Sequence, residues 1–237
     1  MSNVYLSVII PAYNEKERIG KTLAQVVSFL EDQSYESEII VVDDGSQDKT
    51  VVLAGEKLAQ FPHQIIRNPV NQGKGMAVKQ GILAGHGKFL LFTDADLSTP
   101  IEEVKRFLPF LEEGYDIVIG SRALPQSNVA LPQHILRQTM GKVFNRLARL
   151  FTFDGIRDSQ CGFKCFKREA AYDLFRRQRL AGFSFDAEIL YLAQQRGLKI
   201  LELPVTWRNS PQSRVHIIHD SFHMFVDLLK IRWLHRK

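Results

Sequence analysis

The stretch that decides the fold is Phe89-Leu90-Leu91-Phe92-Thr93-Asp94-Ala95-Asp96-Leu97-Ser98-Thr99-Pro100, an apolar run that ends in two carboxylates. The run is too short to span a membrane and long enough for a fully buried strand. Side chains at i and i+2 of an extended chain point the same way, so Asp94 and Asp96 would face one ion at the strand's end. Carboxylate oxygens suit Mg²⁺ or Mn²⁺, and either ion would in turn hold a diphosphate.

The same carboxylates also have a purely structural interpretation. Asp94 would then end the strand, and Asp96 or Ser98 would cap a helix that opens at Pro100. Because short Asp-x-Asp matches arise often by chance, the stretch taken alone favours capping. The neighbouring strands decide between the two interpretations.

Polar loops follow two other predicted strands in the same way. Buried strands over 6–10 and 38–42 run into Pro11-Ala12-Tyr13-Asn14-Glu15 and Asp43-Asp44-Gly45-Ser46. Strand and helix alternate four times up to Phe92, which predicts a parallel sheet covered by helices on both faces. Ligands bind beyond the carboxyl ends of such strands, and all three polar loops lie at that edge. This convergence favours a binding site over capping.

A glycine-rich turn, Asn71-Gln72-Gly73-Lys74-Gly75, precedes another predicted helix. It lacks the spacing of a Walker loop, and no Gly-x-Gly-x-x-Gly follows the first strand. The sequence therefore supports neither a P-loop ATPase nor a classical dinucleotide-binding fold. Lys74 at a helix N-terminus would touch a phosphate, and an ordinary surface lysine fits the turn equally well.

Basic residues concentrate in the second half of the chain, whose net charge is +5 overall. Residues 122–180 contain twelve Lys or Arg and four Asp or Glu. A basic half beside an acidic edge favours anionic ligands, such as phosphate groups, a lipid surface or nucleic acid. No nucleic-acid-binding signature appears, so nucleic acid is not an expected partner.

Cysteine usage and hydropathy indicate a cytoplasmic protein. Cys161 and Cys165, the only cysteines, have a spacing that fits neither a disulfide within one strand nor a metal knuckle. We expect them to be reduced packing residues, and we expect no secretion signal before the first strand. No apolar run approaches the ~20 residues that a membrane-spanning helix needs.

The rest of the chain predicts a strand over 115–122, a loop over 125–132, a helix over 133–151 and a strand over 199–207. Asp186 and Glu188 fall at a helix start, where dipole complementarity alone would explain both. The tail, 216–234, has polar residues at alternating four- and three-residue spacing, which predicts an amphipathic helix. Its apolar face would pack on the domain core or lie in a bilayer interface.

Together these motifs resemble family 2 glycosyltransferases of the GT-A fold, through residues 7–15, 42–46 and 94–98. More specific segments look like the dolichyl-phosphate β-glucosyltransferase (polyprenyl-phosphate glycosyltransferase) branch, namely residues 71–75, 120–122, 155–164 and 185–188. The resemblance covers nearly the whole chain in order. It implies a Rossmann-like α/β fold with a mostly parallel sheet flanked by helices. It also implies one domain over 1–237, in which residues 1–121 bind the nucleotide sugar and residues 122–237 form an acceptor-binding, membrane-proximal half.

The resemblance implies transfer of glucose from UDP-glucose to a polyprenyl or dolichyl monophosphate, with inversion at the anomeric carbon. The uridine would be held by Pro11, Tyr13, Glu15, Asp43 and Asp44. Asp94 and Asp96 would bind Mg²⁺ or Mn²⁺, and with Ala95 and Lys74 they would complete the nucleotide-sugar site. The acceptor phosphate would meet Arg122, Arg137, Ser213 and Arg214, the last two on a loop that would close over the donor. Ser98 stands where related mannosyltransferases place a glutamine that helps bind the metal.

The implied reaction needs little acid–base chemistry, because the acceptor phosphate is already ionised at neutral pH. The expected catalytic residues are Asp94, Asp96, Arg122 and Asp186. The metal would stabilise charge on the leaving UDP, and Asp186 and Glu188 would position the sugar or a basic side chain. If the acceptor were a neutral hydroxyl, a general base would be required, and Asp186 is the best candidate.

The implied branch often carries an N-terminal membrane anchor, and none precedes the first predicted strand here. We therefore expect a peripheral enzyme on the cytoplasmic face of a membrane, held by its basic and amphipathic helices or by an anchoring protein. Two alternatives differ in function. One is a family 2 enzyme that uses another nucleotide sugar or a soluble or protein acceptor. The other is a non-catalytic nucleotide-sugar-binding module, against which the intact Asp-x-Asp argues.

Overall fold

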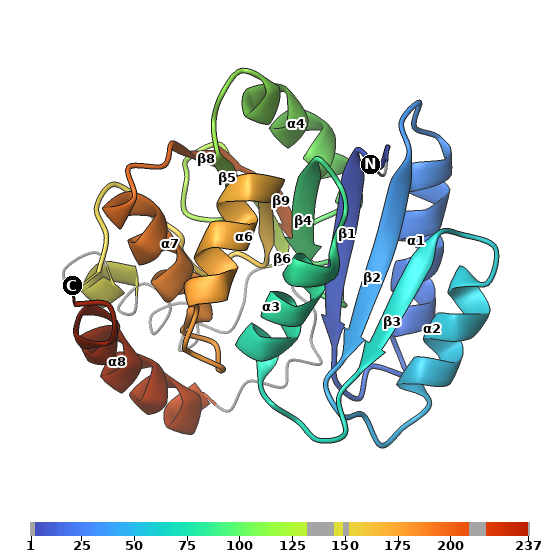
Figure 1. Ribbon diagram of the computed structural model, residues 1–237, viewed down its shortest axis with the longest axis horizontal. Helices are drawn as coiled ribbons and strands as arrows, with labels where there is room; N and C mark the ends of the chain where they lie inside the picture. Colours follow the sequence, from blue (N-terminus) through green and yellow to red (C-terminus); the bar gives the residue numbers. More distant parts are fainter. Residues whose placement is uncertain (1–2, 132–144, 149–151, 209–216, 237) are drawn as a thin grey trace.

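The computed structural model describes residues 3–131, 145–148, 152–208 and 217–236 (Figure 1). Its strands are β1 Leu6–Ala12, β2 Ser37–Asp43, β3 His63–Arg67, β4 Phe89–Thr93, β5 Ile117–Ser121, β6 Asn128–Leu131, β7 Phe163–Lys167, β8 Ile200–Pro204 and β9 Thr206–Arg208. Its helices are α1 Ile19–Glu31, α2 Thr50–Leu58, α3 Lys74–Ala84, the 3₁₀ turn η1 Ile101–Glu103, α4 Val104–Glu112, α6 Arg168–Arg177, α7 Phe185–Gln195 and α8 Ile217–Leu234.

Seven strands form one mixed sheet in the order β3-β2-β1-β4-β7-β5-β8. All neighbours pair in parallel except β7, which runs antiparallel to both β4 and β5. The predicted α/β class and the mostly parallel sheet are therefore confirmed. Because β7 runs the other way, its first residue, Phe163, pairs with Thr93 at the end of β4. This reversal brings a segment from the second half of the chain to the carboxyl edge of the first.

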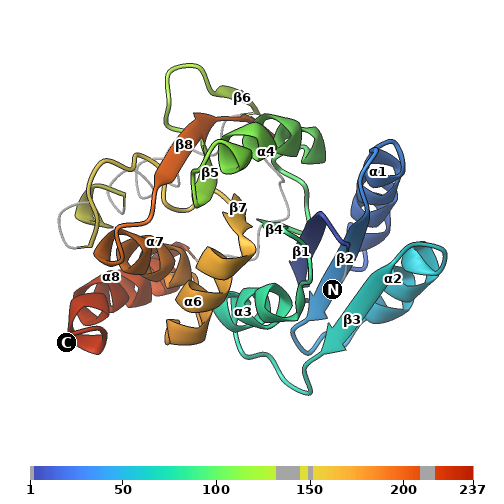
Figure 2. The same cartoon turned by 45° about the horizontal axis from the view of Figure 1, so that its top comes forward.

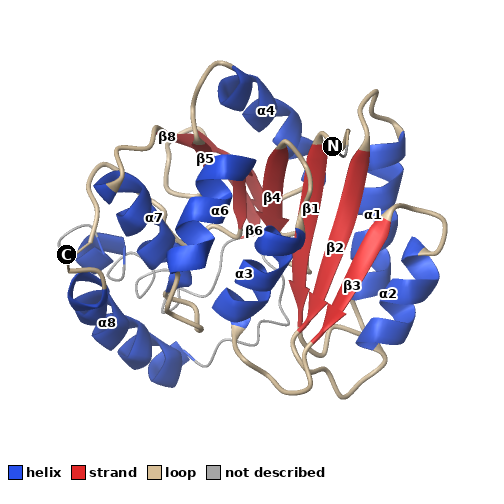
Figure 3. Cartoon of the chain, viewed as in Figure 1, coloured by secondary structure: helices blue, strands red, loops and turns tan. Residues whose placement is uncertain are grey.

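Helices cover both faces of this sheet, and two hydrophobic cores result (Figures 2 and 3). Alternate residues of each strand point to opposite faces, so Ile9 faces one core and Ile10 the other. The core on Ile9's side is completed by α3, α6, α7 and α8. The other core is completed by α1, α2 and α4. Strands buried on both faces explain the nearly continuous apolar runs in the sequence.

Two local predictions in the second half are wrong. The expected loop over 125–132 contains β6, which pairs in parallel with β9 in a separate two-stranded sheet. The single strand expected over 199–207 is divided into β8 and β9, with Val205 between them. The pairing partners of β6 lie more than seventy residues along the chain, so local periodicity carries no signal of that contact.

The C-terminal helix α8 packs beside α7 (Figure 1). Met224, Leu228 and Ile231 are buried in the core on that side, whereas Leu229 and Trp233 are exposed. The predicted helix is thus confirmed, but the prediction of its packed face is wrong. The spacing of the polar residues places Leu229 and Trp233 on the apolar face, whereas the stripe that packs on the domain consists of Met224, Leu228 and Ile231. Among the described residues, no helix has both the length and the apolar character that crossing a bilayer requires. Of the predicted helix over 133–151, only residues 145–148 are described, and they are helical.

Candidate active site

The candidate site lies at the edge of the sheet where β1, β2 and β4 end. The arrowheads of β1, β2 and β3 point to this edge in Figure 1. Asp43 is the last residue of β2, and Asp94 directly follows β4. Since parallel strands present their carboxyl ends together, the polar loops predicted to converge do share one edge.

The turn after β4 is shaped around the two carboxylates. The Asp96 Oδ1 atom accepts a hydrogen bond from the Ser98 backbone N–H at 3.0 Å, so Asp96 does cap the turn as well as face the edge. Leu97 has a φ of 44°, which is rare for a bulky side chain and marks local strain of the kind found at functional sites. Gly162 passes so close to Asp94 that any Cβ at that position would overlap the carboxylate. The Ala95 carbonyl accepts a hydrogen bond from Thr22 Oγ1 at 2.6 Å, which ties the turn to α1.

Lys74, the first residue of α3, forms an ion pair with Asp94, with Nζ and Oδ1 2.6 Å apart. Its ammonium also lies over the Phe92 ring, 5.5 Å from the centroid. Burial alone would lower the pKa of Lys74, but the negative charges of Asp94, Asp186 and Asp96 have a larger opposite effect, so the pKa is raised. Lys74 is therefore a stable cation beside the two carboxylates.

The glycines on either side of Lys74 allow another backbone to approach. The Ala181 carbonyl accepts the Gly75 backbone N–H at 2.7 Å and thereby caps the first turn of α3. A Cβ on Gly73 or Gly75 would lie 2.6 Å and 2.8 Å from that carbonyl oxygen, and Gly73 has a φ of 99°. The glycine-rich turn thus holds a segment of this chain against the N-terminus of α3, and Lys74 offers its side chain to the site.

The two aspartates at the end of β2 have different environments. Asp44 accepts hydrogen bonds from Asn68 Nδ2 and from the backbone N–H groups of Gln72 and Gly73, at 2.8–3.0 Å, so it shapes the glycine-rich turn. Asp43 is fully buried, and its Oδ2 accepts the Ser46 N–H at 3.2 Å. Within the described residues its Oδ1 has no hydrogen-bond partner. A buried carboxylate oxygen without a donor is costly, which makes Asp43 the better candidate for holding a ligand N–H.

The loop after β1 contains the other predicted uridine residues. Pro11 lies in β1 opposite Val42, and Tyr13 is 38% exposed at the edge. The Glu15 carboxylate is held by Arg18, whose Nε and Nη2 each donate at 2.7 Å. Arg18 also approaches Asp96, with Nη1 and Oδ2 3.6 Å apart. Arg18 thus links the β1 loop to the turn after β4.

A buried ion pair between Lys164 and Asp186 lies near the site of Asp94 and Asp96. The Lys164 Nζ atom in β7 donates to Asp186 Oδ1 and to the Cys161 carbonyl, each at 2.6 Å. Both side chains are nearly inaccessible, at 1% and 4% exposed, and the Lys164 ammonium also lies over the Phe92 ring. Burial raises the pKa of Asp186, although Lys164 and Lys74 oppose the shift. Asp186 thus holds a basic side chain, one of the two roles predicted for it.

Arg122, at the end of β5, is held by Asp158 in a two-pronged ion pair. Its Nε and Nη2 atoms donate to the two carboxylate oxygens at 2.7 Å and 2.8 Å, and its backbone N–H also donates to Asp158. Burial alone would raise the pKa of Asp158, but Arg122 reverses the shift and lowers it to about 2. The pair is therefore fully ionised at neutral pH.

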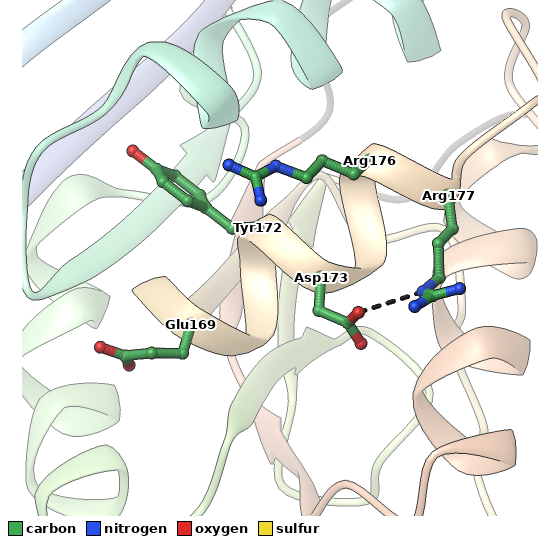
Figure 4. Close-up of a pocket in the computed structure, with 5 residues that line it drawn as sticks. All are labelled: Glu169, Tyr172, Asp173, Arg176 and Arg177. Atoms are coloured by element: carbon green, nitrogen blue, oxygen red, sulfur yellow. Dashed lines mark hydrogen bonds and ion pairs between the residues drawn. The ribbon is translucent and has the colours of Figure 1, made fainter.

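The remaining acceptor-phosphate candidates, Arg137, Ser213 and Arg214, lie outside the described residues. An open hollow on the outer surface of α6 is a separate feature (Figure 4). It is lined by Glu169, Tyr172, Asp173, Arg176 and Arg177, and none of the predicted site residues takes part. Its acids and bases neutralise one another, since Asp173 pairs with Arg177 and Arg196.

The donor set at the edge fits a divalent cation that a nucleotide diphosphate helps to hold. Asp94 and Asp96 are 35% and 21% exposed, so both carboxylates are accessible. No cluster of three or more potential metal-ligating side chains occurs in the described part of the chain. Mg²⁺ characteristically uses one or two protein carboxylates and completes its coordination with phosphate oxygens and water. Two carboxylates are therefore a sufficient protein contribution.

Sequence reasoning missed the partners of the site residues. Lys164, Asp158 and Arg18 were assigned no role, although each forms an ion pair with a predicted residue. A detectable signal existed for Lys164, because a lysine between apolar neighbours in a strand requires a buried counter-charge. Asp158 and Arg18 lie in polar stretches, where a pairing partner leaves no local pattern.

Comparison with known proteins agrees with this geometry. The family model described as glycosyl transferase family 2 matches residues 7–175. The dolichyl-phosphate beta-glucosyltransferase of Dictyostelium discoideum is 35% identical over 246 residues, which cover 98% of this chain and 75% of that protein. The Saccharomyces cerevisiae protein of the same name is 35% identical over 249 residues, which cover 97% of this chain and 74% of that protein.

Among solved structures, glucosyl-3-phosphoglycerate synthase from Mycobacterium tuberculosis, in complex with Mn²⁺, UDP-glucose and phosphoglyceric acid, superposes with a TM-score of 0.73. The match covers 97% of this chain and 79% of that chain at 19% identity, so it establishes the fold. The fold is the GT-A glycosyltransferase fold, as expected. The chain is a glycosyltransferase that belongs to family 2 and, within it, to the dolichyl-phosphate β-glucosyltransferases.

Proposed function

We propose that this enzyme transfers glucose from UDP-glucose to dolichyl or another polyprenyl monophosphate, with inversion and with the help of Mg²⁺ or Mn²⁺. The observation that carries the proposal is the pair of accessible carboxylates, Asp94 and Asp96, at the carboxyl edge of the sheet beside the partly buried cations Lys74 and Arg18. Such an arrangement suits a diphosphate, which is an anion when it binds as part of the nucleotide sugar and gains further negative charge when it leaves the sugar. The choice of glucose as the sugar and of dolichyl phosphate as the acceptor rests on the names of the two relatives described above.

The nucleotide would bind along the ends of β1 and β2. Uracil carries a ring N–H, and the unpartnered Asp43 Oδ1 is a buried acceptor for such a group. Tyr13 would cover the base, with Pro11 at the end of β1 and Glu15 in the loop that follows it. Asp44 would contribute indirectly, because it holds the turn that presents Lys74.

Asp94 and Asp96 would hold the metal, which acts when bound as a Lewis acid that stabilises charge on the departing diphosphate. Lys74 and Arg18 already pair with these two carboxylates and balance their charge. Lys164 holds Asp186 rigidly, so that Asp186 would orient the sugar. A group fixed in advance costs no reorganisation in the transition state.

The acceptor half would be assembled around Arg122. Asp158 occupies Nε and Nη2, so that, as far as the described residues go, Nη1 would be the nitrogen that meets an incoming phosphate. The guanidinium lies 5.6 Å from the Trp207 ring centroid. Residues Arg137, Ser213 and Arg214 are proposed to complete the phosphate site. Because the acceptor phosphate is already ionised, none of these residues has to remove a proton.

The test is an assay with purified protein, radiolabelled UDP-glucose, Mn²⁺ and polyprenyl phosphate. We expect an organic-soluble glucosyl product that forms only in the presence of the metal, and whose glycosidic bond is β because the donor's is α. Matched reactions with UDP-galactose, GDP-mannose and a water-soluble phosphate acceptor measure selectivity. Transfer to the soluble acceptor alone, or no product with any donor, would contradict the proposal.

We also propose that the enzyme works as a peripheral protein on the cytoplasmic face of a membrane. Leu229, Arg232 and Trp233 lie at i, i+3 and i+4 on α8, so they share its outer face, and Trp233 is 69% exposed. Aromatic and cationic side chains together suit the headgroup region of an anionic bilayer. An anchoring protein would supplement this contact.

The α8 surface yields a direct prediction. Replacing Leu229 and Trp233 with serine should weaken binding to vesicles of phosphatidylcholine and phosphatidylserine by about tenfold or more, because apolar burial at the interface is lost. Co-sedimentation measures the effect. Val52→Ser is the matched control, because Val52 is an exposed apolar residue on α2. Equal losses in the two proteins would show that α8 is not the contact.

A further inference from the structure

A short segment between α6 and α7 is docked on the N-terminus of α3. This docking segment, residues 178–182, caps α3 with the Ala181 carbonyl, which accepts the N–H groups of Gly75 and Met76 at 2.7 Å and 3.3 Å. The Gln178 side chain donates to the Gly75 carbonyl at 2.9 Å, and Lys79 donates to the Gln178 carbonyl at 2.8 Å. The N-cap residue of α3 is Gly73, which has no side chain to cap the helix, so these contacts satisfy N–H groups in the first turn that presents Lys74.

Glu188 in α7 holds the docking segment in turn. Its two carboxylate oxygens accept the backbone N–H groups of Arg179 and Leu180, at 2.8 Å and 2.9 Å. The side chain is fully buried. Hydrogen bonds to a buried charged group are among the strongest in proteins, so this carboxylate sets the path of the segment.

The same carboxylate also contacts His235, just after the last turn of α8. The His235 Nε2 atom lies 2.7 Å from Glu188 Oε1, and the His235 side chain is only 10% exposed. Its ring packs beside Tyr191 of α7, with centroids 6.4 Å apart. The contact spans 47 residues of sequence and joins the end of the chain to the interior of the domain.

We propose that Glu188 is a positioning residue for Lys74, and that His235 extends this control to the C-terminal helix. The path runs from His235 to Glu188, through the docking segment to the first turn of α3, and from Lys74 to Asp94. Every step is a direct contact. The end of α8 thus sets how firmly Lys74 is held at the donor diphosphate. The inference rests on the proposed function for the identity of that donor.

The link predicts a specific kinetic change. His235→Ala removes one hydrogen bond from Glu188 and loosens the docking segment. We therefore expect the KM for UDP-glucose to rise about fivefold or more, a typical size for coupling between sites, with kcat changed by less than about twofold. His235→Gln keeps a side-chain N–H near the Nε2 position and should restore most of the affinity. His86→Ala is the matched control, because His86 contacts Glu38 at 3.4 Å, away from the predicted site residues.

Hydrogen exchange tests the same link without any sugar or lipid. In His235→Ala, the amides of residues 75–77 should exchange about fivefold faster than in the unaltered protein. The His86→Ala protein should show no change there. If exchange rises but no UDP-sugar is ever used, the link stands and the proposed function fails. If the unaltered enzyme transfers glucose, and His235→Ala leaves both the exchange rates and the KM unchanged, the link is refuted and the proposed function stands.

Coupling between sites is reciprocal, which gives an independent check. UDP with Mn²⁺ should slow amide exchange in residues 228–235 of the unaltered protein, because a firmly held Lys74 stabilises the docking segment and Glu188. The same addition should have no effect on that region in His235→Ala. Protection of α8 by UDP in both proteins would overturn the proposed path.

Discussion

Asp96→Ala is expected to abolish metal-dependent UDP binding and to lower the transfer rate a few hundredfold. The reason is electrostatic, since removal of one contact to developing charge typically costs about 3–4 kcal/mol of barrier. The fold should survive, because the side chain is partly exposed and, in the described part of the chain, its hydrogen bond to the backbone is the one from the Ser98 N–H at 3.0 Å. Titration calorimetry with UDP, with and without Mn²⁺, measures the binding, and circular dichroism checks the fold.

A companion variant separates the ligand role of Asp96 from its structural role. Asp96→Asn retains an oxygen that can accept the Ser98 N–H but loses the negative charge. It should therefore keep the turn and still lose the metal-dependent binding. Glu102→Gln is the control, because it removes a carboxylate from an exposed position close by in the sequence. If Mn²⁺ enhances UDP affinity equally in all three proteins, the metal is held elsewhere.

Much of the fold could be predicted because its strands are buried on both faces. Runs such as residues 38–42 and 89–92 are unmistakable, and their order along the chain with short connectors implies a parallel sheet. The insertion of β7 between β4 and β5 could not be predicted in this way. It reverses direction and comes from a segment seventy residues away from β4. Strand partners at such a distance leave no trace in local periodicity.

The residues of the candidate site likewise fall into those that the sequence could place and those that it could not. Asp94, Asp96 and Asp43 could be placed at one edge, because each follows a recognisable strand. Several of their partners could not, because the pairs that Arg18 forms with Asp96 and Lys164 forms with Asp186 join distant segments of the chain. The glycines flanking Lys74 show the difference most clearly. The sequence of this turn predicts a phosphate contact only for Lys74 and no role for the glycines, whereas in the structure the glycines allow the Ala181 carbonyl to approach α3.

Lys164→Met should be the most destabilising of the substitutions considered, with a loss of about 3–5 kcal/mol in the free energy of unfolding. Methionine fills the space of the lysine stem, but Asp186 would be left buried beside it without its principal counter-charge. Breaking a buried pair from one side costs far more than exchanging both partners. A chain of this length should lose on the order of 10 °C in its melting temperature.

The double variant, Lys164→Met with Asp186→Leu, distinguishes a structural pair from a functional one. Replacing both charges with apolar side chains should recover most of the lost stability. It should not recover glucose transfer, because the carboxylate proposed to orient the sugar is gone. Lys167→Met on the same strand is the matched control. Its partner Asp116 is 3.9 Å away and the lysine is 29% exposed, so we expect a change below about 1 kcal/mol. If the double variant recovered both stability and activity, the Lys164–Asp186 pair would have only a structural role, and Asp186 would have no role in the reaction.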